Sequence, residues 1–391
     1  MRKLYLFRVR EILRECAFLT TIGLGILALA GALKEARAQE NLRYEITKIV
    51  IPDPNSNFSG ATHINEYGEV VGFFGQKHRE NHVLDYELWR KAFLYKNKIV
   101  KDLDKFDIYG HQNINYRNPA INDLGEIVAS KAKIGGNYTQ KSSIYTLGQT
   151  TEIDFCGKDI NNKGEVVGGK WLYSGGQIIE LPSSPSVTEY NAINDSNQIV
   201  GYWRGVVVGP FPVLLENRVI ATDFAIISHG VGAAFDINNN SKIVGYSGDE
   251  SHAIACLWEK IGDRWLIKRL DTINSTAWAI NDNGQVVGSS DLNTSLPIAV
   301  LYQKDKQNNI VKINLNDFLP ENSEFERLVC ALDINDKGQI VGYGEGRNEP
   351  GSQYAFVMTP IPKPSADLTE DGIVNFYDLA EFANQWLTAE P

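Results

Sequence analysis

The sequence predicts an all-β fold, a seven-bladed β-propeller with four-stranded blades. The first observation behind this prediction is a short stretch, AINDNGQVVG at residues 279–288, which occurs seven times in related form. The isoleucines of the seven copies are Ile64, Ile121, Ile160, Ile193, Ile237, Ile280 and Ile334. They follow one another at intervals of 33 to 57 residues, 45 on average. Propeller blades repeat at about 40 to 50 residues, which is the same range.

Each copy is predicted to form a tight hairpin. The segment Asn281-Asp282-Asn283-Gly284 suits a type I turn whose last residue has a positive φ, where glycine is least strained. Short polar side chains in such a turn can also bind their own backbone. The β-branched residues of the following VVG segment favour a strand. Because Asn197 and Ser241 replace the turn glycine in copies four and five, we expect the fifth copy to use a different turn.

The second observation is a pair of apolar segments beside most copies, which would add two outer strands to each hairpin. Examples are residues 92–95 with 98–100, 171–173 with 177–179, and 255–258 with 265–267. Four antiparallel strands per repeat make a small twisted sheet that cannot bury both faces alone. Sheets of this kind bury their faces when they stand radially against their neighbours.

The third observation concerns the ends of the repeat array. Residues 44–50 resemble an outer strand that lacks a preceding partner, and residues 354–358 resemble the partner that is missing. We therefore predict that one blade is shared between the two ends and closes the ring. The predicted propeller extends over residues 39–360.

The N-terminus is predicted to be an export signal that occupies residues 1–38. Five arginines and lysines precede an apolar run at residues 17–33, and Ala36-Arg37-Ala38 fits a cleavage site. The alternative is an uncleaved membrane anchor, because 17 apolar residues approach the length of a bilayer span. After cleavage we expect no stable membrane span.

The net charge bears on the class of partner that the protein can bind. The formal net charge is −10, and removing seven basic and three acidic residues with the signal would leave −14. This charge disfavours nucleic acid as a partner and is compatible with cations and neutral glycans. The three cysteines outside the signal, Cys156, Cys256 and Cys330, cannot all pair. We predict that they are small packed side chains rather than disulfides.

The C-terminal segment is predicted to be a small calcium module, residues 367–391, behind a proline-rich linker at 361–366. Its loop has the spacing of a twelve-residue calcium site. The predicted ligands are Asp367, Thr369, Asp371, Ile373 (through its carbonyl), Asn375 and Asp378. Downstream, Leu379, Phe382, Ala383 and Trp386 follow the spacing of an amphipathic helix. The alternative is an acidic solvated tail.

This segment resembles a single dockerin repeat, the calcium loop and helix found at the C-termini of secreted bacterial proteins. Asp378 at loop position 12 is typical of that family, although dockerins usually carry two such repeats. The resemblance implies calcium-dependent folding and docking to a cohesin-like partner on a cell surface or scaffold.

The repeat array is similar to the HAF-repeat family of bacterial extracellular proteins. The similarity rests on the seven Ile-Asn-x-x-Gly-Gln-Val-Val-Gly hairpins and on strands such as Lys91-Ala92-Phe93-Leu94-Tyr95. It covers residues 44–360 and implies a location outside the cytoplasm, in the periplasm, on the cell surface or in the medium. It implies no particular activity.

Two sets of side chains are candidates for function. Asp159, Asp236 and Asp333 directly precede the repeat isoleucine, as does His63, and could bind a cation or supply an acid and a base in a central channel. The alternative is that they satisfy turn amides or form a solvated strand end. Aromatic residues that follow the hairpin, Phe73, Tyr202, Tyr246 and Tyr343 with Phe74 and Trp203 next to them, could form a ligand surface that stacks on sugars. They could equally fill the wedges between blades.

The sequence therefore favours an exported, non-catalytic binding or interaction propeller with a calcium-dependent docking or sorting tag. The alternative is a carbohydrate-active enzyme, a glycoside hydrolase or lyase, which the tag attaches to a surface complex. A structural role at the cell surface is a third hypothesis. The chain contains no zinc-protease helix motif, no nucleophile elbow and no sialidase box.

Overall fold

The computed structural model divides the chain into two compact units. One is Tyr44–Pro360, which we call the repeat domain, and the other comprises Met1–Arg43 and Ile361–Pro391. The described residues are 42–75, 88–110, 119–132, 140–183, 188–204, 209–221, 226, 230–249, 252–272, 274–291, 296–362 and 377–379. The predicted signal peptide and most of the predicted calcium module lie outside them.

The repeat domain contains five separate antiparallel sheets, each made of four strands in chain order. They are β6–β9 (Ala120–Ile121, Ile127–Ala132, Gln140–Thr146, Gln149–Ile153), β10–β13 (Asp159–Ile160, Val166–Gly168, Trp171–Ser174, Gln177–Glu180), β14–β17 (Thr188–Ile193, Ile199–Arg204, Pro210–Glu216, Val219–Ala221), β18–β21 (Val231–Ile237, Ile243–Gly248, Ala253–Ile261, Arg264–Arg269) and β22–β25 (Ser275–Ile280, Val286–Asp291, Pro297–Lys304, Ile310–Asn314). The first two strands of each sheet flank one copy of the repeated hairpin, as predicted.

The remaining eight strands form two groups of four. One group is β2–β5 (Phe58–Ile64, Val70–Gly75, Leu88–Lys96, Ile99–Gly110). The other is β26–β28 (Phe325–Ile334, Ile340–Gly346, Gln353–Pro360) with β1 (Tyr44–Lys48), and a short 3-10 helix, η1 (Leu315–Phe318), precedes it. A single parallel pair, Phe58 with Gln353, joins the two groups into one sheet.

The two ends of the repeat domain meet in the same sheet. β1 pairs with β28 in antiparallel register from Tyr44–Pro360 to Lys48–Phe356, and the Ile49 amide donates to the Ala355 carbonyl at 2.9 Å. The predicted pairing of the first and last strands is therefore confirmed. It joins segments that are about 300 residues apart in the sequence.

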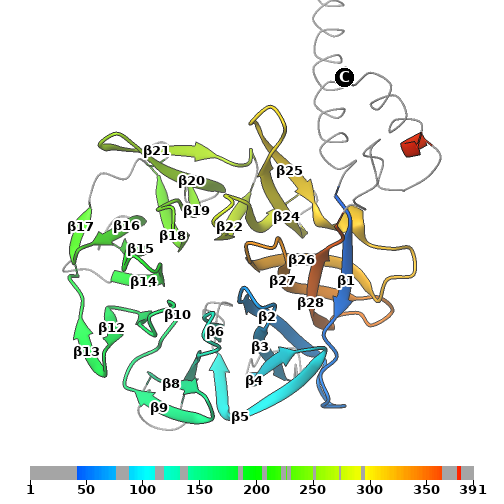
Figure 1. The fold of residues 1–391 in the computed structure, drawn as a ribbon, viewed down its shortest axis with the longest axis horizontal. Coiled ribbons are helices and arrows are strands. Elements are labelled where there is room, and N and C mark those ends of the chain that lie inside the picture. The colour runs from blue at the N-terminus through cyan, green and yellow to red at the C-terminus, as the bar shows by residue number, and fades with distance from the viewer. Residues whose placement is uncertain are drawn as a thin grey trace, which may run out of the picture. The chain divides into compact units, whose positions relative to one another are not determined.

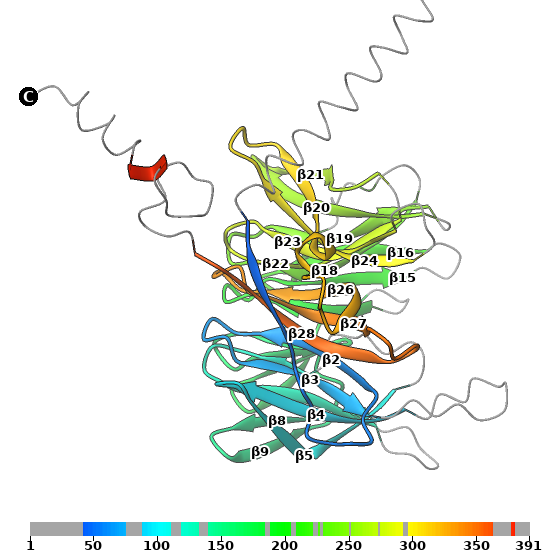
Figure 2. The same ribbon diagram turned by 90° about the vertical axis from the view of Figure 1, so that its right-hand side faces the viewer.

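The sheets succeed one another around a centre, with the first strand of each hairpin innermost (Figure 1). In the side view the strands run between the two faces of the domain (Figure 2). This arrangement is all-β and propeller-like. The hydrophobic core lies between neighbouring groups of four strands, because five buried clusters draw their residues from two consecutive sheets and a sixth joins β2–β5 to β26–β28.

The last glycine of the hairpin motif has a steric role. At Gly72, Gly168, Gly201, Gly245, Gly288 and Gly342, a Cβ would overlap a backbone carbonyl oxygen close to it in space. Glycine is therefore required for close approach of the two strands. Copy two has Ala129 here, and in the described residues its inner strand β6 pairs through Ala120 with Val128 and through Ile121 with Ile127.

Candidate functional site

The repeated turn has the same conformation in all seven copies. The residue at the glycine position has a positive φ each time, from 58° at Ser241 to 78° at Gly284. In each copy its amide donates to the carbonyl of the repeat asparagine at 2.9 to 3.1 Å. The expectation of a different turn in the fifth copy is therefore wrong. Ser241 adopts the strained conformation and donates its hydroxyl to Gln198 of the neighbouring turn, at 2.8 Å.

The repeat asparagines form a closed circuit of hydrogen bonds, which we call the asparagine ring. Each Nδ2 donates to the carbonyl of the asparagine in the next copy at 2.9 to 3.2 Å, and the seventh donates to the first. The members are Asn65, Asn122, Asn161, Asn194, Asn238, Asn281 and Asn335, all at most 5% exposed. Each Oδ1 accepts from amides of its own turn, as at Gln285. One side chain thus closes its own turn and connects it to the next.

A second repeated position supports this ring, and sequence reasoning missed it. The residue four positions after the asparagine accepts from Nδ2 in six copies, as Glu165 does at 2.9 Å. It is Glu69, Glu126, Glu165, Gln198, Gln285 or Gln339, and Lys242 in the fifth copy. The sequence contains a signal for this position, because Glu or Gln recurs four residues after the asparagine in six copies.

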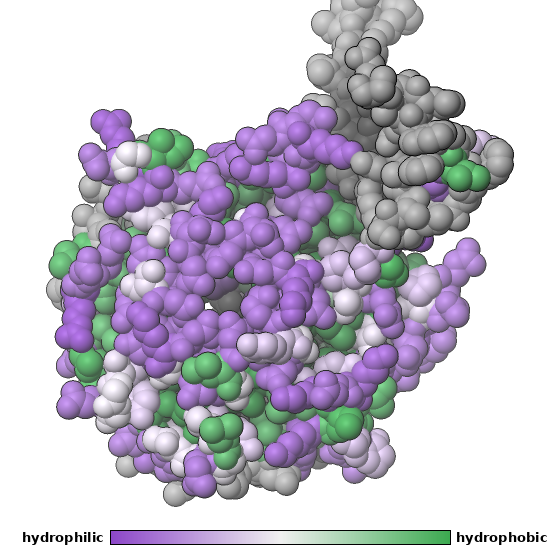
Figure 3. Space-filling view, viewed as in Figure 1, coloured by the Kyte–Doolittle hydropathy of each residue, from purple (hydrophilic) through white to green (hydrophobic). Residues whose placement is uncertain are grey.

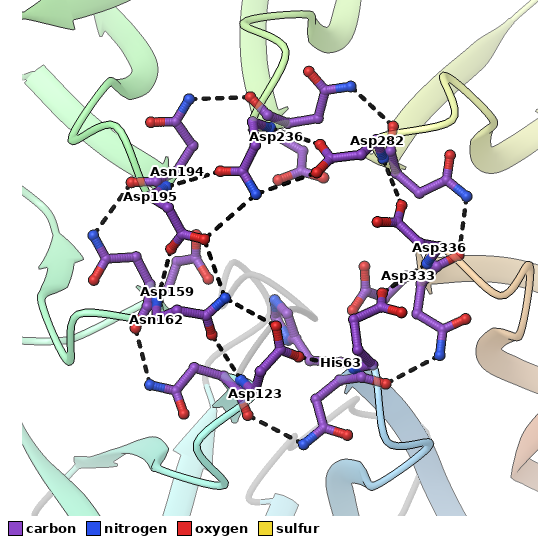
Figure 4. A pocket seen from close by; sticks show the side chains of 18 of the residues that line it. His63, Asp123, Asp159, Asn162, Asn194, Asp195, Asp236, Asp282, Asp333 and Asp336 are labelled. Atoms are coloured by element: carbon purple, nitrogen blue, oxygen red, sulfur yellow. Dashed lines mark hydrogen bonds between the residues drawn. The ribbon is translucent and has the colours of Figure 1, made fainter.

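The residue after each asparagine forms a second closed circuit, the acidic ring. Every backbone amide donates to the side-chain oxygen of the next copy at 2.7 to 3.0 Å, again from the seventh copy back to the first. The members are Glu66, Asp123, Asn162, Asp195, Asn239, Asp282 and Asp336. These bonds run around a central pocket of about 200 Å³ (Figure 4). Hydrophilic residues surround the central hollow in the space-filling view (Figure 3).

Charge is distributed unevenly around the acidic ring. Asn162 donates to Asp123 and Asp195 at 2.9 and 3.1 Å, and Asn239 lies between Asp195 and Asp282 in the same way. No amide side chain stands between Asp282, Asp336, Glu66 and Asp123, which follow one another. Burial and the neighbouring carboxylates raise the pKa of both Glu66 and Asp336, although hydrogen bonds from backbone amides oppose the increase.

Replacing Asp336 with asparagine is expected to stabilise the protein by about 0.5 kcal/mol at neutral pH. The amide keeps an acceptor for the Asp282 backbone and relieves repulsion between like charges. Because the folded-state pKa of Asp336 is raised, the native protein loses stability as pH rises through that pKa. The advantage of Asp336→Asn should therefore vanish toward pH 4. Urea unfolding at both pH values, with Asp195→Asn as control, measures it; equal gains at both pH values would contradict this reading.

The predicted channel residues line the pocket, and their side chains contact backbone groups. Asp159, Asp236 and Asp333 each accept from the isoleucine amide of the next copy at 2.8 to 2.9 Å. His63 Nδ1 lies 3.0 Å from the Pro119 carbonyl oxygen. The three aspartate contacts match the alternative in which the side chains satisfy amides, whereas His63 contacts a carbonyl oxygen. The described residues contain no group of three or more His, Cys, Asp or Glu placed to hold a metal ion.

Some residues of the predicted aromatic surface are fully buried, and the others are half-buried. Phe73 and Phe74 are 1% and 2% exposed, and Phe73 fills the space between sheet β2–β5 and sheet β6–β9. Phe73 therefore forms no part of an open ligand surface. Trp203 is half-buried against Phe211, with ring centroids 4.9 Å apart.

The other predicted aromatic residues lie about midway along the second strand of their hairpins, in β15, β19 and β27. Tyr202 pairs with Glu189 three rungs beyond the pair that flanks the turn, and Tyr246 and Tyr343 occupy the equivalent positions. All three are half-buried. They therefore lie three rungs away from the turns that carry the acidic ring.

Two further aromatic residues, Phe235 and Trp278, extend this group. Each is the extra residue of a β-bulge in an inner strand. Their rings stack at 4.6 Å, and Phe235 also contacts Tyr246 at 5.7 Å. Cys330 lies beside Trp278 and Tyr343, and burial raises the pKa of its thiol to about 12. We call Tyr202, Phe235, Tyr246, Trp278 and Tyr343 the aromatic crescent.

Sequence reasoning missed Phe235 and Trp278, because only the bulges turn these two side chains toward one another. Of the predicted calcium ligands, Asp367, Thr369, Asp371, Ile373 and Asn375 lie outside the described residues. Asp378, in the helical residues 377–379, is 3% exposed, and Leu379 beside it is exposed.

All three described cysteines are free of disulfide bonds. No helix in the described part of the chain is long and apolar enough to cross a bilayer.

Comparisons with known proteins found one family model and several solved structures that are similar to this chain. Residues 229–359 match a family described as "Protein of unknown function (DUF3466)". A protein of unknown function from Dyadobacter fermentans is 12% identical over 82% of this chain and 99% of its own, with a TM-score of 0.42. A gluconolactonase from Xanthomonas campestris is 7% identical over 84% and 93%, at 0.44. An α-L-arabinofuranosidase from Fusarium graminearum is 11% identical over 82% and 97%, at 0.40. No curated protein matches the sequence significantly. Similarities at this level carry no information about activity.

Proposed function

We propose that the repeat domain is a closed seven-bladed propeller. Five four-stranded sheets and two further groups of four strands supply the blades. Closure is supported by the two circuits of hydrogen bonds, because in each the seventh copy binds the first. A rigid ring of this kind holds side chains from distant parts of the sequence in fixed positions at its two ends.

We further propose that this propeller is a binding module and that its ligand is a glycan. The observation that carries the proposal is the aromatic crescent, which presents half-buried rings from four consecutive blades at one mouth. Aromatic rings with polar edges stack on the apolar faces of sugars while their hydroxyl or indole groups bind sugar hydroxyls. At the opposite mouth the circuits that connect the turns surround the central pocket.

The alternative of a carbohydrate-active enzyme has less support. A glycosidase needs two carboxyl groups that are available to the bond being cleaved. Here Asp159, Asp236 and Asp333 accept backbone hydrogen bonds that connect neighbouring blades. Their use in the scaffold favours binding without cleavage.

The predicted signal and the calcium module complete the proposal. We propose that the protein is exported and that residues 367–391 act as a calcium-dependent docking or sorting tag for a cohesin-like or other surface protein. Isothermal titration of the full chain with calcium, against a chain that ends at residue 362, tests the tag. Equal binding by both chains would assign calcium elsewhere.

A glycan-array screen of the secreted protein tests the proposed function. We expect a ligand for which Trp278→Ala lowers affinity about tenfold, since losing one stacking ring removes about 1.4 kcal/mol of binding energy. Tyr67→Ala is the matched control, because Tyr67 is 73% exposed in a turn at the other mouth. Thermal unfolding of both variants checks that they fold. Absence of any bound glycan would overturn the binding proposal, and new reducing ends after incubation would favour the enzyme.

A further inference from the structure

The innermost strands (Figure 1) carry a third repeated position, two residues before the repeat isoleucine. In five copies the residue at this position is the extra residue of a β-bulge, namely Thr62, Asn191, Phe235, Trp278 and Leu332. A bulge interrupts the alternation of side chains along a strand and re-aims the extra one. Here the extra side chain contacts the next copy. Asn191 Nδ2 donates to the Ala234 carbonyl at 2.9 Å, and Phe235 stacks on Trp278 at 4.6 Å.

Lys158 occupies the same position in the third copy. Its Nζ donates to the Glu189 carboxylate at 2.7 Å and to Asn191 Oδ1 at 2.9 Å. Both partners belong to the fourth copy, so Lys158 also contacts the next copy. Side chains at this position therefore connect copies three to six in order, first through polar contacts and then through stacked rings.

Lys158, Glu189 and Asn191, which we call the polar cluster, lie directly beside the aromatic crescent. Asn191 binds the carbonyl of the peptide unit that leads into Phe235. Glu189 is the cross-strand partner of Tyr202, and residues directly opposite each other in a sheet have their side chains on the same face. Two members of the crescent, one from copy four and one from copy five, thus border the polar cluster.

The polar cluster is partly accessible. The Lys158 and Glu189 side chains are 15% and 32% exposed, whereas Asn191 is 6% exposed and is held by hydrogen bonds to both neighbouring copies. The ion pair balances its own charge. A carboxylate can accept about four hydrogen bonds and an ammonium can donate three, so the pair can bind hydroxyl groups of a ligand while it stays intact.

We infer that the polar cluster binds two neighbouring hydroxyl groups of a neutral sugar whose ring stacks on Phe235 or Trp278. One hydroxyl group donates to the Glu189 carboxylate, and the other accepts from the Lys158 ammonium, both as charge-assisted hydrogen bonds. A carboxylate on the glycan would instead meet Glu189 in a chain whose net charge is −10, and like charges repel. This inference rests on the proposed function, because it names the class of sugar that the same site receives.

The experiment titrates four neutral tetramers (of β-1,4-glucose, β-1,3-glucose, β-1,4-mannose and β-1,4-xylose) and the tetramer of galacturonate into the full chain by calorimetry. We expect at least one neutral tetramer to bind more tightly than the acidic one. Glu189→Gln and Lys158→Gln should each weaken its binding about tenfold or more, the range expected for a hydrogen bond to a charged group. Glu180→Gln is the matched control, because the Lys170–Glu180 ion pair has a similar length of 2.6 Å but is exposed at the outer strand β13.

Deoxy analogues of the tightest neutral tetramer separate direct contact from an effect on structure. Replacing either of two neighbouring hydroxyl groups with hydrogen should weaken binding to the native protein about tenfold. Glu189→Gln should no longer discriminate against the analogue that lacks its partner hydroxyl group, because that contact is already lost. Thermal unfolding shows whether each variant folds, and Lys158→Gln supplies the same comparison for the other hydroxyl group.

Three results would overturn the inference and leave the glycan-binding function standing. They are native affinity in both Glu189→Gln and Lys158→Gln, tighter binding of the galacturonate tetramer than of every neutral one, and discrimination against the deoxy analogues that both variants retain in full. If no tetramer, acidic or neutral, binds at millimolar concentration, the proposed function itself fails.

Discussion

Replacing Gly288 with alanine is expected to destabilise the repeat domain by about 3 kcal/mol or more. The added Cβ would overlap the Thr276 carbonyl oxygen and lie 3.0 Å from its carbonyl carbon and 3.2 Å from the Cα of Ala277. These are backbone atoms of the paired inner strand, so no side chain can rotate away. Overpacking against a rigid backbone typically costs about 1 to 3 kcal/mol and sometimes more. Urea unfolding of the purified protein measures the difference.

Gly284→Ala is the control for this experiment. Gly284 has a positive φ of 78°, but the atom nearest to an added Cβ is the flexible Lys242 Nζ at 3.5 Å. Only conformational strain is introduced there, which is about 1 kcal/mol. The steric account of Gly288 would be refuted if both variants lost the same stability.

Replacing Asn161 with aspartate is expected to destabilise the protein by about 3 kcal/mol at pH 8. Asn161 is 4% exposed, and its Nδ2 donates to Glu165 at 2.9 Å and to the Asn194 carbonyl at 3.2 Å. An aspartate oxygen in that place would face two acceptors, one of them charged. An uncompensated buried charge costs about 3 to 5 kcal/mol, and local adjustment reduces the loss.

The loss at Asn161→Asp should depend on pH in a defined direction. Burial and repulsion from Glu165 raise the folded-state pKa of the introduced carboxyl group above its unfolded value of about 3.9. The variant therefore becomes less stable as pH rises through the folded-state pKa, and it regains stability when the pH is lowered toward 4. Unfolding curves at pH 4.5, 6 and 8 measure the trend.

Asn238→Asp is the matched comparison for Asn161→Asp. Asn238 occupies the same place in the asparagine ring, and its Nδ2 donates to the Asn281 carbonyl at 2.9 Å, but the residue four positions later is Lys242. The substituted side chain would lose one donor without meeting a second carboxylate. We expect about half the loss and little change with pH. A similar pH dependence in both variants would show that Glu165 is not responsible.

The role of the asparagine in its own turn could be predicted from the sequence. Its second role, the connection of one copy to the next, could not. A turn asparagine recurs because it satisfies amides of its own turn, which is a local property and is visible at any single copy. That Nδ2 of one copy reaches the next depends on the position of the neighbouring sheet. The cyclic order, with Asn335 bound to Asn65, exists only when the chain ends have met.

The aromatic crescent shows the same limit. Tyr202, Tyr246 and Tyr343 were found because they follow the repeated glycine, yet Phe73 at the equivalent place is buried. Phe73 packs with Phe58, Leu103 and residues of the next sheet, and the repeat pattern does not predict that packing. Phe235 and Trp278 lie outside the repeated motif and meet only because each inner strand bulges.

The sequence by itself determined the seven hairpins, the strands outside them and the pairing of the first and last strands. These features depend on turn geometry and on alternating apolar residues, which are encoded over a few neighbouring positions. Only the tertiary structure decided which polar side chains connect one copy to the next and which aromatic rings are fully buried or half-buried. Those outcomes depend on the radial packing of sheets from distant parts of the chain, because a side chain at a blade edge is buried or exposed according to what its neighbour presents.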